Sequence, residues 1–258
     1  MRIGRGRSLA LASMLALGAC APGTEAADPP SPVTPTEPSP TATIQDVTEQ
    51  LGDSPPLQPG TYFIDPDADP STPLRVVFEV PVEGWSSWIG AAKSEGDWVA
   101  VSITSVTNLV RHGCRDHSQA DPPVGPSVDD LAAAMADLGP FRVTSPPTDV
   151  TIYGYSGKHL ELTVPDMPYE VRGDVPVFTG CTGYDWHRRF LMSWIAPHLV
   201  AAGGYGYYGY NGPGHTEEFW ILDVEGTRLV IAADRSPESP GEDLAEVQAI
   251  LDSIRIEP

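Results

Sequence analysis

Runs of β-branched and aromatic residues predict most of the strands in this chain. Four such segments lie between turn-forming residues, at 60–64, 74–80, 98–106 and 190–196. The last segment is almost wholly apolar, which is typical of a strand buried on both faces.

Two further pairs of segments predict β-hairpins. Residues 149–153 and 158–164 flank a turn at Gly154–Gly157, and residues 217–224 and 227–233 flank Glu225-Gly226. In the second strand of the first hairpin, apolar residues alternate with His159, Glu161 and Thr163. This alternation predicts one apolar face and one face toward solvent or a neighbouring strand.

Helical periodicity marks three segments. The clearest is 127–138, where Ser127 and Asp130 form a capping box and apolar residues recur at helical spacing. A second box, Ser239 with Glu242, precedes an apolar stripe at Leu244, Val247, Leu251 and Ile254. A short helix over 43–52 is expected from Ile44, Val47 and Leu51.

These elements together predict an α+β fold. Short turns between successive strands favour antiparallel pairing, and the two amphipathic helices have one apolar stripe each. We therefore expect an antiparallel sheet covered on one face by two amphipathic helices. A disordered Pro-rich linker is expected before it, because residues 20–55 are dense in Pro and Thr at their start.

The N-terminus has the pattern of an export signal. Three arginines precede an apolar run over 9–17 that is too short to cross a bilayer, and the run ends at Leu17-Gly18-Ala19-Cys20. This tetrapeptide resembles the lipobox of bacterial lipoproteins. The resemblance implies that Cys20 carries a diacylglycerol thioether and becomes the first residue; the alternative is an ordinary secretory signal with a chance cysteine.

The resemblance sets the expected organisation and location. We expect a cleaved signal peptide at 1–19, a lipidated linker at 20–55 and a single globular domain at 56–258. The protein is expected on the extracytoplasmic face of the cell membrane, and the N-terminal lipid is the predicted membrane contact.

The charge excludes one class of partner. The formal charge is −20, and loss of the three signal arginines changes it to −23. Such a surface repels phosphate backbones, so nucleic-acid binding is excluded. The expected partner is an envelope protein or a small ligand, with no cofactor.

The three cysteines leave an even pair once Cys20 is assigned to lipid. In an oxidising compartment, Cys114 and Cys181 are expected to form a disulfide. The rival interpretation is a metal site that uses these thiolates with His117 and His187. Structural zinc sites have tighter paired spacing, which favours the disulfide.

Candidate chemistry elsewhere is sparse. Asp65–Pro70 alternates aspartates, but Pro70 and Val76 stand where an EF-hand loop needs Gly and Glu, which favours a solvated turn. Gly154-Tyr-Ser-Gly157 lacks the last glycine of a nucleophile elbow. The glycine-rich loop 203–214 is either a recognition loop or a connector, and its candidate ligand-binding residues are Tyr205, Tyr207, Tyr208 and Tyr210.

The segment Pro81–Trp85, with its P-x-x-G-W pattern, and the ending Asp252-Ser-Ile-Arg-Ile256 are similar to the Mog1/PsbP-like group. That resemblance implies a binding or assembly module. The leading hypothesis is therefore a non-enzymatic envelope lipoprotein. The alternatives are an extracytoplasmic hydrolase, for which His112, His117 and His187 are candidate residues, and a calcium-dependent adhesion module.

Overall fold

The computed structural model describes residues 44–48, 54–93, 98–172, 175–182, 191–197, 207–210 and 212–258. All of them belong to one compact unit that runs from Ala42 to Pro258. Within the described ranges, no helix is long and apolar enough to cross a membrane.

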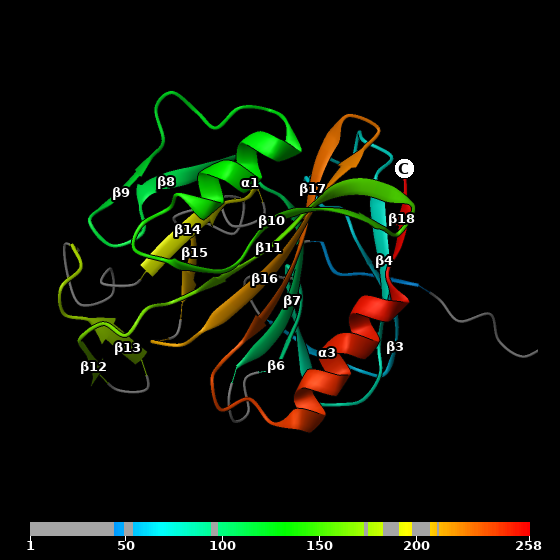
Figure 1. Cartoon of the computed structure of the whole chain (residues 1–258). Coiled ribbons are helices and arrows are strands. Elements are labelled where there is room, and N and C mark those ends of the chain that lie inside the picture. The colour runs from blue at the N-terminus through cyan, green and yellow to red at the C-terminus, as the bar shows by residue number, and fades with distance from the viewer. Residues whose placement is uncertain are drawn as a thin grey trace, which may run out of the picture. The chain divides into compact units, whose positions relative to one another are not determined.

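The centre of this unit is an antiparallel sheet of eight strands (Figure 1). In spatial order the strands are β10 (Arg142–Ile152), β11 (Tyr155–Thr163), β16 (Thr216–Val224), β17 (Thr227–Arg235), β7 (Val99–Ser105), β6 (Gly90–Lys93), β5 (Trp85–Trp88) and β2 (Pro56–Leu57). The edge strand β10 holds Pro146 and Pro147, which an interior strand does not accommodate because proline lacks a backbone donor.

Three smaller sheets complete the fold. The first has the order β1 (Gln45–Asp46), β3 (Gly60–Ile64), β4 (Arg75–Val80) and β18 (Arg255–Glu257). The second has the order β15 (Tyr207–Tyr210), β14 (Leu191–Ile195), β8 (Asn108–His112) and β9 (Asp116–Gln119). A two-stranded ribbon joins β12 (Tyr169–Arg172) to β13 (Val175–Phe178).

The two helices in the described ranges lie on opposite faces of the central sheet. Helix α1 (Val128–Ala136) packs on β10, β11 and β16, whereas α3 (Gly241–Ser253) packs on β7 and on β4 of the first small sheet. Alternate residues of β17 enter two separate cores: Leu229 and Ile231 join Val247 of α3, and Val230 joins Leu131 of α1. We call the two sides of the sheet the α3 face and the α1 face.

This arrangement corrects the expected fold class. The protein is mostly β, and its sheet is not covered on one face by two amphipathic helices. An apolar stripe predicts that a helix has a buried side, but it does not say which sheet face meets that side. Strands β7 and β17 are buried on both faces, so both faces require cover, and each helix contributes to a different one.

Helix α1 is capped as its sequence predicts. The Ser127 hydroxyl accepts a hydrogen bond from the Asp130 amide at 3.1 Å, and the Asp130 carboxylate accepts one from the Ser127 amide at 3.1 Å. The second predicted box is wrong, because Pro240 is the N-cap of α3 and Ser239 instead bonds to Trp98 and Ser236.

Two other local predictions are corrected. Residues 45–46, expected within a helix, form the parallel strand β1 beside β3. The first hairpin turns at Tyr153-Gly154, whose φ angles are +55° and +86°, and not across Gly154–Gly157. Gly157 lies inside β11, where an added Cβ would meet the Ile221 carbonyl oxygen at 2.0 Å, so close strand packing explains this glycine.

Candidate functional site

The predicted disulfide is confirmed. Cys114 and Cys181 are bonded, and both are buried in the core on the α1 face. The bond joins the turn between β8 and β9 to the residues after β13. Thr182 strengthens this junction by donating its hydroxyl to the carbonyl of Cys114 at 2.9 Å.

The side chains of His112 and His117, near the disulfide, bond to backbone groups of their own loop. His112 Nδ1 accepts hydrogen bonds from the amides of Cys114 and Arg115, each at 3.1 Å. His117 Nε2 lies 3.0 Å from the Gly113 carbonyl, and burial lowers the pKa of His117 despite that bond. Among the described residues, no group of three or more His, Cys, Asp or Glu is placed to hold a metal ion.

The remaining predicted site residues are described only in part. Cys20, His187 and Tyr205 lie outside the described residues. Tyr207, Tyr208 and Tyr210 belong to β15, which pairs with β14, so part of the expected loop is a strand. The tyrosine side chains lie outside the described part, so the proposed recognition role stays a prediction.

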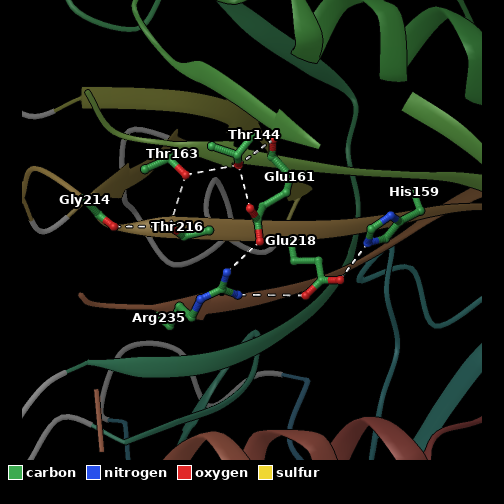
Figure 2. Close-up of polar contacts among 8 residues, drawn as sticks. All are labelled: Thr144, His159, Glu161, Thr163, Gly214, Thr216, Glu218 and Arg235. Carbon is green, nitrogen blue, oxygen red and sulfur yellow. Dashed lines mark hydrogen bonds and ion pairs between the residues drawn. The ribbon is translucent and has the colours of Figure 1, made fainter. Parts of the chain in front are cut away.

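A group of polar side chains lies on the α3 face where α3 leaves the central sheet uncovered (Figure 2). We call it the surface cluster, and it comprises Thr144, His159, Glu161, Thr163, Thr216, Glu218 and Arg235. The residues come from four adjacent strands, β10, β11, β16 and β17, so the register of the sheet places them together.

Arg235 is the centre of the surface cluster. Its guanidinium lies 2.6 Å from Glu161 and 3.9 Å from Glu218. Glu218 also lies 2.6 Å from His159 Nε2. Thr144 donates to the Glu161 carboxylate at 2.6 Å (Figure 2).

The charged side chains of the surface cluster pair with one another. Partial burial alone would raise the pKa of Glu161, but hydrogen bonds from Thr144 and Arg235 outweigh burial, so the pKa lies below its usual value. A carboxyl held anionic in this way is unsuited to act as a general acid. Cross-strand pairs of this kind stabilise a sheet, and we assign the cluster that structural role.

A second polar group lies on the opposite, α1 face of the same sheet. We call it the buried cluster, and it comprises Trp88, Trp98, Ser102 and Asp234. Residues two apart on one strand, and direct partners on adjacent strands, share a sheet face. By this rule four small residues lie on the same face among the members of the cluster. They are Gly90, Ala92, Ala100 and Ala232, and we call them the floor of the cluster.

The register places the four members around Ala100. Ser102 and Trp98 are its neighbours two positions away along the chain, and Asp234 is its direct partner on β17. Trp88 is the partner of Gly90, which in turn pairs with Ser102. The two indole rings meet edge to face with centroids 6.0 Å apart.

Four polar atoms of the buried cluster have no hydrogen-bond partner. They are Trp88 Nε1, Trp98 Nε1, Ser102 Oγ and Asp234 Oδ2, and all four are shielded from solvent. Ser102 and Asp234 are each only 1% exposed. Buried polar groups are normally paired, so several orphaned atoms on one patch of a sheet make it a candidate binding site for ordered water or a ligand.

Two further buried residues border this patch. His215 Nε2 bonds to Asp234 Oδ1 at 3.0 Å, and the Trp194 indole donates to Glu217 at 2.9 Å. Glu217 is the direct cross-strand partner of Asp234 and is fully buried. The patch therefore holds two acidic side chains on adjacent strands beside a histidine.

Sequence reasoning missed the buried cluster entirely. Trp88 and Trp98 read as ordinary core aromatics, and Asp234 stands just after the end predicted for its strand. A signal did exist: the pattern Glu217-x-Phe219 opposite Ala232-x-Asp234 places acids on a face that is otherwise apolar.

Comparison of the chain with protein-family models, with curated proteins and with solved structures finds no match. No residue role is therefore transferred from a relative, and the assignment of a site depends on the geometry of the two clusters.

Proposed function

We propose that this protein is a non-enzymatic ligand-binding module, held on the extracytoplasmic face of the cell membrane by a lipid on Cys20. The anchoring part follows from the lipobox-like Leu17–Cys20 segment and the Pro-rich segment behind it. The binding part places the ligand at the buried cluster.

The observation that carries the binding part is the convergence of unpartnered polar atoms. A buried donor or acceptor without a hydrogen-bond partner destabilises the fold by about 1–3 kcal/mol relative to a paired one. Four such atoms together therefore destabilise it substantially unless a bound molecule pairs with them. Ser87 Oγ and Arg228 Nε are also unpartnered, but each stands alone. Among the residues that the structure describes, the buried cluster alone places unpartnered donors and an acceptor around one group of small residues.

The surface cluster favours binding over hydrolysis as the general activity. Its two carboxylates are paired with cations, and Glu161 is held anionic, which leaves it without a proton to donate. The described histidines expected to serve a hydrolase, His112 and His117, bond to backbone groups of their own loop. The hydrolase stays an untested alternative.

A thermal-shift screen of the full chain tests the proposal. The wild type is screened against chemically distinct small molecules: neutral sugars, amino acids, primary amines, carboxylates and inorganic phosphate. We expect at least one class to raise the melting temperature of the wild type. The same compound should give no shift with Ser102→Ala, which removes one orphaned atom of the cluster.

The control is Ser87→Ala. Ser87 is as buried as Ser102, at 1% exposed, and its hydroxyl is also unpartnered, but it lies on the α3 face with Trp85. This variant should retain the full ligand-induced shift. A screen in which no class stabilises the wild type, or in which both variants respond alike, would contradict the proposal.

A further inference from the structure

We infer that the ligand of the buried cluster is a neutral polyhydroxylated molecule of the size of one sugar unit. This inference rests on the proposed function and names the ligand class for that same site. The ligand class follows from three properties of the cluster: the atoms that donate, the atoms that accept, and the charges beside them.

The cluster demands a ligand that both accepts and donates hydrogen bonds. The indole N–H groups of Trp88 and Trp98 can only donate, and the free oxygen of Asp234 can only accept while the carboxylate is ionised. Ser102 can do either. A ligand must therefore supply at least two acceptors and one donor within a small space, and adjacent hydroxyl groups do so because each hydroxyl donates once and accepts twice.

Charged ligands fit the site less well. An anion would lie beside Asp234 and its buried neighbour Glu217, on a face where water cannot screen their repulsion. An ammonium group would satisfy Asp234, but it has no acceptor to offer, so both indole N–H groups would stay unpartnered. An uncharged ligand with several hydroxyl groups can pair with all four atoms without placing a charge on this face.

The aromatic rings supply the apolar half of the recognition. Trp88 and Trp98 are partly exposed although their Nε1 atoms are buried, so the rings border solvent while their polar atoms face inward. An aromatic ring packs well against the C–H face of a small ring, and its N–H still finds a polar partner. Ala100 and Ala232 are fully buried and the four polar atoms are closed to solvent, so a ligand reaches them only by displacing the residues that cover this face.

Isothermal titration of the full chain tests the inference. The neutral probes are glucose, galactose, mannose, N-acetylglucosamine and myo-inositol; the charged probes are ethylamine, succinate and inorganic phosphate. We expect at least one neutral probe to bind and the charged probes not to bind. Trp98→Phe and Ser102→Ala should each weaken that binding at least tenfold, whereas Ser87→Ala should change it less than twofold.

The variants separate ligand recognition from damage to the fold. Trp98→Phe keeps a ring and removes an unpartnered donor, so the free variant should melt at the wild-type temperature or above it. A variant that loses sugar binding and also melts lower has lost structure, and the conclusion then rests on Ser102→Ala.

Each contrary result has a distinct meaning. If only ethylamine, succinate or phosphate binds and Ser102→Ala abolishes that binding, the ligand class is wrong and the proposed function stands. If a neutral probe binds the wild type and the cluster variants equally, the sugar site is elsewhere and the inference is overturned. If no probe binds and the thermal-shift screen also fails, ordered water is the partner of these atoms and both proposals fall.

Discussion

The disulfide offers the sharpest test of what stabilises this fold. Cys114 and Cys181 are separated by 67 residues, and closing a loop of that length lowers the entropy of the unfolded chain. The loop-entropy relation gives about 4 kcal/mol for this separation. The loop contains β9, α1, β10 and β11, so the bond constrains much of the α1 face of the sheet.

We therefore expect the double variant Cys114→Ala/Cys181→Ala to lose about 4 kcal/mol of unfolding free energy. For a domain of this size the melting temperature should fall by about 8–16 °C. Urea titration followed by tryptophan fluorescence measures the loss directly. Wild type treated with a reductant should fall to nearly the same midpoint, because its constraint is also removed.

A double variant that unfolds within about 1 kcal/mol of the wild type would contradict this prediction. That outcome would mean that the packing of α1 and the strands, not the cross-link, holds the two loops together. A change in the slope of the urea curve would instead indicate that the variant alters the unfolded state or the cooperativity.

Three further predictions address other parts of the chain. Partial burial and the neighbouring Asp67 raise the pKa of Asp65 from 3.8 to about 6, so its contribution to stability is full below about pH 4 and is lost as pH rises through 6. Asp65→Asn should remove this slope from urea midpoints measured between pH 4.5 and 7. Gly154→Ala should cost about 1 kcal/mol because the turn needs φ = +86°, whereas Gly241→Ala in α3 should gain about 0.4–1 kcal/mol; urea midpoints of both test this. Cys20→Ala should abolish incorporation of labelled palmitate and move the protein out of the membrane fraction.

The strands were the most predictable part of the fold. Segments with strong β propensity, such as 60–64 and 217–224, match β3 and β16 closely. Short strands such as β6 and β9 were not expected, because Gly-Ala-Ala-Lys and Asp-His-Ser-Gln have neither alternation nor β-branched residues. Such strands exist because longer neighbours supply the pairing, which is a tertiary effect that local pattern does not contain.

The placement of the helices shows the same limit. The capping box at Ser127 involves atoms within four residues, so sequence reasoning could predict it. The box at Ser239 has the same pattern of a serine and an acid three residues later, but there the hydroxyl accepts a hydrogen bond from the Ser236 amide and donates one to the Trp98 carbonyl, 141 residues away. The hydroxyl is therefore held by backbone groups outside the helix, and the contact with Trp98 exists only in the folded chain.

The two polar clusters show why a candidate site is harder to predict than a fold. Both lie on the central sheet and share strand β17, and in both the strand residues are ordinary members of an alternating pattern. The surface cluster is mutually paired, and the buried cluster is not; this difference depends on the register of β7 against β17, which places Ala100, with no polar atom in its side chain, opposite Asp234. Asp234 Oδ1 bonds to His215, but the alanine opposite Asp234 offers no donor to its Oδ2. The small side chain of Ala100 thus leaves Asp234 Oδ2 without a hydrogen-bond partner in the sheet, and the function that we propose depends on which molecule pairs with it.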